Sequence, residues 1–153
     1  MIFMKQKIML DNNAFDSLIK EINLLLKTLD KYEYYLIDIT YDELIAIPDT
    51  KKEKRLNLLE MMNKLNINFA YTTPAVYGKV KYGRSKYAGD TKAFESILKC
   101  TRSNINDALI GSSAIAENCI LVTNDTEFQA KMRNNAYDVL STDEFIEYIR
   151  KYE

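Results

Sequence analysis

Four carboxylates are the side chains of this sequence best suited to chemistry: Asp11, Glu43, Asp107 and Asp125. Carboxylates that lie close together repel and raise one another's pKa values. A divalent cation relieves that repulsion, so a cluster of this kind is usually a metal site. A cation held by oxygen ligands can lower the pKa of a bound water and stabilise charge on a phosphoryl oxygen. If the four groups converge, they would therefore suit phosphodiester hydrolysis.

The composition narrows the chemistry further, because none of the 153 residues is histidine. This excludes histidine-based acid–base catalysis, Ser-His-Asp and Cys-His nucleophiles, and metal sites with imidazole ligands. The two cysteines, Cys100 and Cys119, fit no zinc pattern. Any metal chemistry must then use oxygen ligands, which indicates Mg²⁺ or Mn²⁺. The net charge of −1 provides no global basic field, so contact with RNA would need a local patch.

Length and composition indicate one globular domain that spans residues 1–153. Lys5 and Lys7 interrupt the apolar residues of the N-terminal segment, which lacks the pattern of a signal peptide. No later stretch is apolar enough for a membrane span. We expect a cytoplasmic protein with no membrane partner.

Short β-branched or aromatic runs alternate with helical periodicity, which predicts an α/β fold with a parallel sheet. We expect a long helix after the first strand, with its apolar face running from Phe15 to Leu29. Further helices are expected near Tyr41, over Lys51–Leu65, after Thr73-Pro74, over Thr91–Cys100, near Ile105, over Glu127–Met132 and after Ser141. The strands are expected at Lys5–Leu10, Tyr35–Thr40, Ile67–Tyr71, Ile120–Thr123 and Tyr137–Leu140.

This organisation brings the carboxylates to one edge of the sheet. Functional groups of an open parallel sheet collect beyond the carboxyl ends of its strands. Asp11 and Asp125 follow the first and fourth strands, and Glu43 follows the second. Asp107 lies in the first turn of the helix that leads into the fourth strand, and that turn lies at the same edge. The topology therefore predicts convergence of residues that are far apart in the sequence.

Each acid also has a plain structural interpretation. Asp11 and Asp125 fit helix N-caps, and Thr40-Tyr-Asp-Glu43 fits a capping box in which Glu43 only bonds a backbone amide. Asp107 in a first turn would interact favourably with the dipole of its helix, but it shares a face with the apolar residues of that helix. A carboxylate that points to the packed side of a helix needs a partner. Asp107 is therefore the acid that its structural interpretation explains least well.

Four segments together resemble the PIN-domain family: KIMLDNNAF with Asp11, DITYDEL with Glu43, NINDALIGSSAIAENC with Asp107, and ILVTNDTEF with Asp125. Their order and spacing agree with the family over nearly the whole chain. The resemblance implies a three-layer α/β/α fold with a central, mostly parallel five-stranded sheet. It implies a Mg²⁺- or Mn²⁺-dependent ribonuclease in which a metal-activated water attacks the phosphodiester in line and leaves a 5′-phosphate.

The resemblance also assigns roles to residues. Asp11, Asp107 and Asp125 would be the principal metal ligands, and Glu43 would bind metal or orient the water. Thr123 would support the ligands from behind, and Glu127 stands where many relatives carry an aspartate. Independently of the resemblance, Asn12 flanks Asp11 and could bind substrate or water, or could equally be a turn residue. Many small bacterial members are VapC-type toxins that form dimers and are neutralised by an antitoxin. A homodimer and a cognate antitoxin are therefore expected partners beside the RNA substrate.

Basic residues could contact the RNA. The segment KVKYGRSK is positively charged, contains no acid and has tyrosines close by, which could neutralise phosphates and stack on unpaired bases. A solvated helix face explains the same pattern equally well. The candidate phosphate contacts are Arg102, Lys79, Lys81, Arg84 and Lys86.

Two alternative functions of the chain stay open, and one alternative fold is less well supported. A catalytically inactive PIN-fold interaction module would fold normally but would not cleave RNA. A PIN ribonuclease of RNA processing would cleave RNA without an antitoxin partner. A receiver or haloacid-dehalogenase-like phosphotransfer fold is weak, because Asp11 is followed by two asparagines and no DxDxT motif exists.

Overall fold

The computed structural model describes residues 4–70, 105–134 and 136–151. Its strands form one parallel sheet of five strands, with the order β3-β2-β1-β4-β5. The strands are β1 (Gln6–Leu10), β2 (Tyr32–Ile37), β3 (Asn68–Ala70), β4 (Ile120–Val122) and β5 (Val139–Leu140). The expected α/β class and five-stranded parallel sheet are confirmed.

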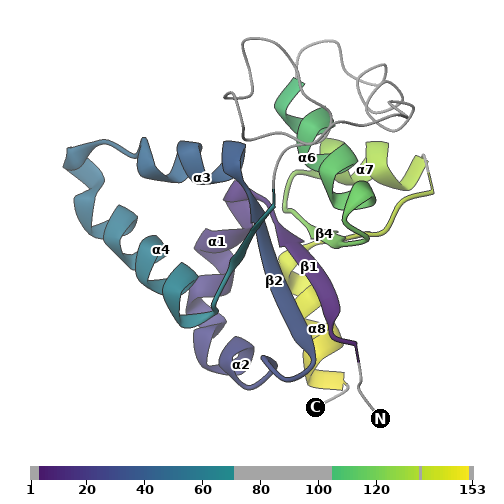
Figure 1. The fold of residues 1–153 in the computed structure, drawn as a ribbon, viewed down its shortest axis with the longest axis horizontal. Helices are drawn as coiled ribbons and strands as arrows, with labels where there is room; N and C mark the ends of the chain where they lie inside the picture. The colour runs from purple at the N-terminus through teal and green to yellow at the C-terminus, as the bar shows by residue number, and fades with distance from the viewer. Residues whose placement is uncertain (1–3, 71–104, 135, 152–153) are drawn as a thin grey trace.

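Helices connect these strands in the order that the periodicity predicts (Figure 1). Two short 3₁₀ turns, η1 (Ile19–Glu21) and η2 (Asp49–Lys51), join helical segments. The helices are α1 (Asn12–Leu18), α2 (Ile22–Leu26), α3 (Asp38–Ile45), α4 (Lys52–Lys64), α6 (Ile105–Ala116), α7 (Thr126–Asn134) and α8 (Thr142–Lys151). The helices expected after Thr73-Pro74 and over Thr91–Cys100 lie outside the described residues.

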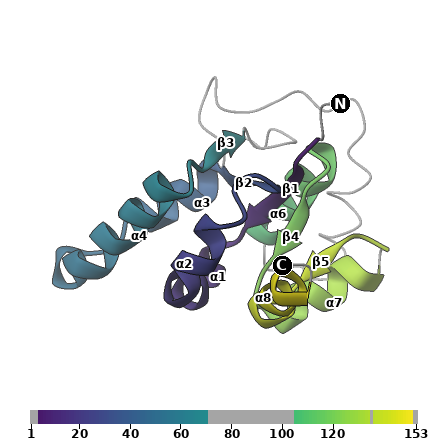
Figure 2. The ribbon, with the colours of Figure 1, turned by 90° about the horizontal axis from the view of Figure 1, so that it is seen from below.

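Alternating side chains of the strands build a separate core on each face of the sheet. In β1, Ile8 and Leu10 pack into one core, and Met9 packs into the other. Apolar residues of α1, α2, α4 and α8 complete the first core, and those of α6 and α7 complete the second. This is the expected three-layer α/β/α architecture. Figure 2 shows the molecule from below, with α4, α2 and α1 to the left of β1 and β4 and α7 to the right.

Two local predictions differ from the structure. The long helix expected from Phe15 to Leu29 is divided by the turn η1, which begins at the β-branched residue Ile19 and is followed by Ile22 at the start of α2. The second strand runs from Tyr32 to Ile37, earlier than expected, and α3 already begins at Asp38. The first residues of α3 are buried, so the apolar run that predicted a strand continues into the first turn of this helix.

The strand order reverses beside β1. Connections from β1 lead through β2 to β3 on one side, whereas β4 pairs with β1 on the other. In open α/β sheets, ligands bind beyond the carboxyl ends of the strands at such a switch point. Asp11 follows β1, and Thr123 and Asp125 follow β4, so the fold directs attention to this edge. Among the described residues, no helix has the length and apolarity that a membrane crossing requires.

Candidate active site

A hollow of about 430 Å³ opens at the carboxyl edge of the sheet, beside the switch point. It is bounded by the four acids that the sequence singles out, together with polar side chains of α1 and α6. Its lining consists of Asp11, Asn12, Asn13, Asp16, Glu43, Lys54, Asn106, Asp107, Ile110 and Asp125. The structure therefore brings Asp11, Glu43, Asp107 and Asp125 together, as the topology predicts.

Asp11 joins the two strands at the switch point. One carboxylate oxygen accepts a hydrogen bond of 2.8 Å from the backbone amide of Asn12, and so caps α1. The other accepts one of 2.8 Å from the hydroxyl of Thr123, which directly follows β4. Burial raises the pKa of Asp11 despite these two hydrogen bonds, and the charge of Asp125 adds to the rise. Asp11 is a helix cap and a constituent of the acidic hollow at once.

Asp125 has the same double position at the start of α7. Its Oδ1 accepts hydrogen bonds from the backbone amides of Glu127 at 3.0 Å and Phe128 at 3.1 Å. Its own amide donates to Oγ1 of Thr123 at 3.2 Å, so this hydroxyl contacts both capping acids. The N-cap interpretation is thus correct for Asp125, and its side chain still lines the hollow.

Glu43 is held by two amides rather than by a capping box. The side chain of Asn12 donates to Oε2 at 3.3 Å, and the side chain of Asn106 donates to Oε1 at 3.0 Å. Thr40 lies inside α3 instead of capping it, and its buried hydroxyl has no hydrogen-bond partner among the described residues. Burial raises the pKa of Glu43, and the charge of Asp11 adds to the rise. The capping-box interpretation of Glu43 is therefore wrong.

Asp107 lies on the packed face of α6, as expected. It is only 8 % exposed, and Ile110, Gly111 and Ala114 on the same helix are also buried. Its pKa is raised to about 6, first by burial and then by the negative charges of Asp11, Asp125 and Glu43. The ammonium of Lys131, 3.9 Å from Oδ2 of Asp107, opposes this rise. Asp107 thus shares electrostatic interactions with the three other acids.

A network behind the acids ties the edge together. The side-chain oxygen of Asn13 accepts from the amide of Asn124 at 2.9 Å and from the hydroxyl of Thr123 at 3.3 Å. The side chain of Asn124 turns away from the hollow, where it bonds Ser17 and Thr142. Asn124 is therefore part of the scaffold that fixes α1, β4 and α8, and Thr123 supports the acids directly.

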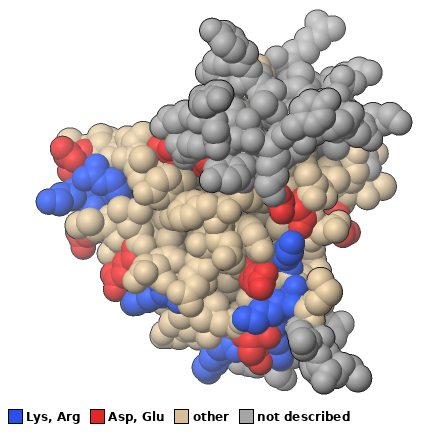
Figure 3. All heavy atoms as spheres, in the orientation of Figure 1, with Lys and Arg blue, Asp and Glu red and all other residues tan. Residues whose placement is uncertain are grey.

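The remaining predicted residues divide into two groups. Glu127 is exposed and is not part of the lining, because its position in α7 carries its side chain to the surface. The candidate RNA contacts lie outside the described residues: Arg102, Lys79, Lys81, Arg84 and Lys86. On the described part of the face in Figure 3, basic and acidic side chains are interspersed, without a broad basic surface.

Sequence analysis missed two residues that contribute to the site. Asn106 directly precedes Asp107, and only its position at the first turn of α6 gives a hint of its role. Lys131 follows Asp125 by six residues in an otherwise amphipathic helix, where a lysine normally indicates a solvated face. Both signals depend on partners that are remote in the sequence.

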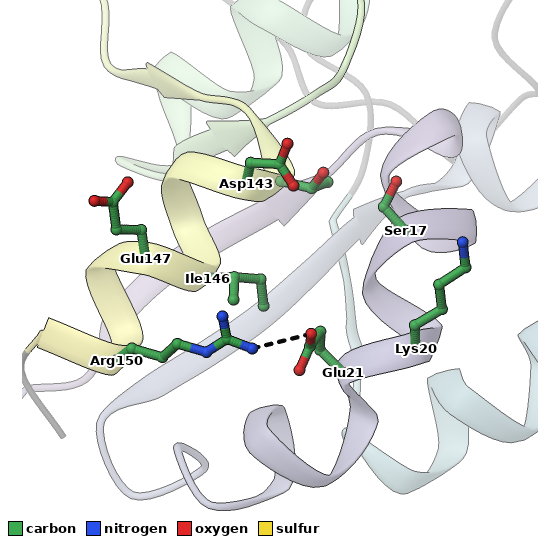
Figure 4. A pocket seen from close by; sticks show the side chains of 8 residues that line it. Ser17, Lys20, Glu21, Asp143, Ile146, Glu147 and Arg150 are labelled. Atoms are coloured by element: carbon green, nitrogen blue, oxygen red, sulfur yellow. Dashed lines mark hydrogen bonds and ion pairs between the residues drawn. The ribbon is translucent and has the colours of Figure 1, made fainter.

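A second hollow, of about 480 Å³, lies between α1–η1 and α8 (Figure 4). Arg150 forms an ion pair with Glu21 at 3.1 Å within it. Its charges have both signs and come from separate helix faces: Lys20, Glu21, Asp143, Glu147 and Arg150. No group of converging acids marks it, so the hollow at the switch point is the better candidate for chemistry.

The acidic hollow has the donor chemistry of a site for a hard divalent cation. All its charged donors are carboxylates, and carbonyl oxygens of asparagine side chains lie beside them. In the part of the chain that the structure describes, no three acidic or cysteine side chains already lie in position to hold one ion together. The acids instead engage Thr123, backbone amides, Asn12, Asn106 and Lys131. The donor set fits Mg²⁺ or Mn²⁺, and its carboxylates are held by hydrogen bonds and an ion pair with other groups of the protein.

The fold and the acidic edge define a three-layer α/β protein with a carboxylate site at the switch point of its sheet. The PIN-domain family model matches residues 8–133, and the chain belongs to this family. Among curated proteins, none matches the chain significantly.

Solved structures show the same fold at low sequence identity. PAE2754 from Pyrobaculum aerophilum is 14 % identical, with a TM-score of 0.62, over 96 % of this chain and 90 % of the other. VapBC2 from Rickettsia felis, bound to a DNA fragment from its promoter, is 22 % identical, with a TM-score of 0.57, over 89 % and 98 %. A domain of a functionally unknown protein from Methanocaldococcus jannaschii is 20 % identical, with a TM-score of 0.54, over 89 % and 90 %.

Proposed function

We propose that this chain is a divalent-metal-dependent endoribonuclease that hydrolyses RNA phosphodiester bonds, and that it is the toxin of a toxin–antitoxin pair. The observation that carries the proposal is the convergence of Asp11, Glu43, Asp107 and Asp125 in one hollow of a PIN-domain chain. PIN domains are generally nucleases, and the chain has no histidine with which to cleave RNA by other means.

In this proposal Asp11, Asp107 and Asp125 hold Mg²⁺ or Mn²⁺. A bound cation supplies Lewis-acid chemistry, since it lowers the pKa of a water and stabilises charge on phosphoryl oxygens. The protein supplies position. The hydroxyl of Thr123 fixes Asp11, and the amides of Asn12 and Asn106 fix both oxygens of Glu43.

Glu43 is the group best placed to orient the attacking water. Its two oxygens are held by hydrogen bonds, so its carboxylate has a defined direction at the wall of the hollow. Without a cation, burial and the neighbouring charge of Asp11 raise its pKa. We therefore assign Glu43 the role of accepting a hydrogen bond from water, rather than that of a principal ligand.

The toxin role rests on the likeness to VapBC2, which extends over 89 % of this chain and 98 % of the other. We propose a cognate antitoxin and a second copy of this chain as protein partners. The antitoxin would have to block access to the acidic hollow, directly or through the elements that border it. A PIN ribonuclease of RNA processing would have the same hollow but no inhibitory partner, so co-purification with an inhibitor separates the two.

The decisive experiment is cleavage of a mixed RNA pool by the parent and by Asp107→Asn, in Mg²⁺, Mn²⁺ or EDTA. Asp143→Asn is the matched control, because Asp143 lies in the first turn of α8 and does not line the acidic hollow. We expect Asp107→Asn to lose about 100-fold or more in rate, as is typical when a charge-stabilising group is removed. The control should match the parent, and EDTA should abolish cleavage.

Two results would contradict this mechanism: equal cleavage by the parent and Asp107→Asn, or cleavage that EDTA does not reduce. A folded parent that cleaves no RNA in either metal would instead favour the inactive interaction module.

A further inference from the structure

Lys131 is a buried cation beside Asp107, behind the lining of the acidic hollow. It lies in α7, the helix that Asp125 caps, and is only 6 % exposed. Its ammonium lies 3.9 Å from Oδ2 of Asp107. Lysine is rarely buried unless it is paired, because transfer of an ammonium out of water is costly. The negative charge of Asp107 offsets part of this cost.

The surroundings of Asp107 explain why a cation is needed there. Three other carboxylates, Asp11, Asp125 and Glu43, act on Asp107 and disfavour its charged form, and Lys131 acts in the opposite direction. Such repulsion has to be balanced either by proton uptake or by a positive charge nearby. Lys131 provides that charge from within the fold, 3.9 Å from Oδ2 of Asp107.

A second lysine at the hollow offers a contrast. The side chain of Lys54 is 47 % exposed and pairs with Asp16 at 3.3 Å, at the rim. Exposed pairs of this kind contribute little to stability, because water screens them. Lys131 has only 8 % of its side chain exposed, and its partner Asp107 only 12 %. Lys54 and Lys131 therefore carry the same positive charge near the acids, one in an exposed ion pair and one in a buried pair, which provides a matched comparison.

We propose that Lys131 is a built-in counter-cation of the acid cluster: it stabilises the site without metal, and a divalent cation displaces it from Asp107. The first half depends only on the described contacts, and the second half rests on the proposed function. Removal of Lys131 then has two opposite effects. The metal-free fold becomes less stable, and the cluster binds a divalent cation more tightly, because the competing charge is gone.

The test compares thermal unfolding of the parent, Lys131→Met and Lys54→Met, in EDTA and across a Mn²⁺ titration. Methionine keeps the length of the side chain and removes the charge. In EDTA we expect Lys131→Met to lose about 4 °C or more in Tm, as for a change near 1–2 kcal/mol in a domain of this size. Its Mn²⁺ midpoint should fall about tenfold, as expected when a charge within a few ångströms is removed. Lys54→Met should match the parent in EDTA, and its Mn²⁺ midpoint should fall less than that of Lys131→Met, because water screens the charge of Lys54.

A double variant, Lys131→Met with Asp107→Asn, tests the electrostatic cause without metal. Removal of one acid should restore most of the Tm that Lys131→Met loses in EDTA. A single variant that is unfolded in EDTA but folds with Mn²⁺ or with Asp107→Asn also supports the proposal. A single variant that stays unfolded in all three conditions contradicts it, as does a Tm loss that is the same in EDTA and in saturating Mn²⁺.

The two proposals fail in different ways. If the parent gains no Tm from Mn²⁺, the metal-dependent function is wrong, and the displacement of Lys131 by metal is wrong with it. Rescue by Asp107→Asn in EDTA would still establish the counter-cation. If the parent binds Mn²⁺ but Asp107→Asn rescues nothing, the metal site stands and the role of Lys131 is wrong.

Discussion

Burial and three neighbouring acids disfavour the charged form of Asp107, and this predicts an unusual dependence of stability on pH. Its pKa is raised to about 6 in the fold, against an ordinary value of 3.8. The folded protein therefore binds a proton more tightly than the unfolded chain, so stability without metal falls as the pH rises from about 4 to about 6. Asp11 and Glu43 have raised pKa values as well and act in the same direction.

The measurement is urea unfolding in EDTA at pH 4, 5, 6 and 7. We expect the parent to lose stability over this range and Asp107→Asn to lose clearly less, because asparagine does not titrate. Identical pH profiles of the two proteins would contradict a raised pKa of Asp107.

Thr123 links the two capping acids, and its hydroxyl can be removed without change of shape. Thr123→Val leaves Asp11 without the 2.8 Å hydrogen bond and should cost about 2 kcal/mol in the free energy of unfolding. RNA cleavage should also fall, because Asp11 loses its fixed direction. Thr28→Val is the control, since that hydroxyl is also buried. It bonds the backbone oxygen of Leu25 and the hydroxyl of Tyr34, and Thr28 does not line the acidic hollow. This variant should lose stability but retain cleavage.

The positions of the acids could be predicted from the sequence, but not their partners. Asp11 and Asp125 follow strands, and parallel strands end at one edge, so their convergence needs only the topology. Glu43 is held by Asn12 and Asn106, which are 31 and 63 residues away in the chain. No local rule identifies such partners. The burial of Lys131 likewise becomes apparent only once α7 packs beside α6.

Among the elements, α7 separates the capping role of an acid from its charge. Asn caps helices about as well as Asp, whereas Ala removes the cap. Asp125→Asn should therefore change the free energy of unfolding by less than about 0.5 kcal/mol, and Asp125→Ala should lower it by about 1 kcal/mol. Both variants should lose RNA cleavage if the charge binds metal. Retained cleavage in Asp125→Asn would reduce Asp125 to a helix cap.

Two similar sequence patterns show how far local reasoning reaches for the elements. Ser141-Thr-Asp-Glu144 has the capping-box pattern, and both of its hydrogen bonds are present at 3.1 Å. The equivalent pattern at Thr40 and Glu43 forms no capping box, because α3 begins earlier, at Asp38. At Glu144 the guanidinium of Arg133 binds the same oxygen at 3.0 Å without displacing the local bonds. At Glu43 the side-chain amides of Asn12 and Asn106 bind the carboxylate in place of a capping box. Propensity decides element ends only where tertiary contacts do not.

At the scale of the whole molecule, the two cores share one sheet, so we predict that the chain unfolds as one unit. Phe15 lies in one core and Phe128 in the other, and both are fully buried. Phe15→Leu and Phe128→Leu should each cost about 1–3 kcal/mol. In each variant, far-UV circular dichroism and tyrosine fluorescence should report a single common transition, since a shared sheet couples the faces. Two separate transitions would contradict the single domain.

The hydrogen bond between Thr123 and Asp11 has a consequence for folding during translation. It spans 112 positions of the chain and depends on β4 lying beside β1. A ribosome that adds about 5–20 residues per second needs roughly 6–20 s to pass from one partner to the other. For most of that interval the emerging polypeptide contains β1 but neither Asp107 nor Asp125. If the folded protein cleaves RNA, its own messenger and the ribosome that translates it are exposed to a complete site only near the end of synthesis.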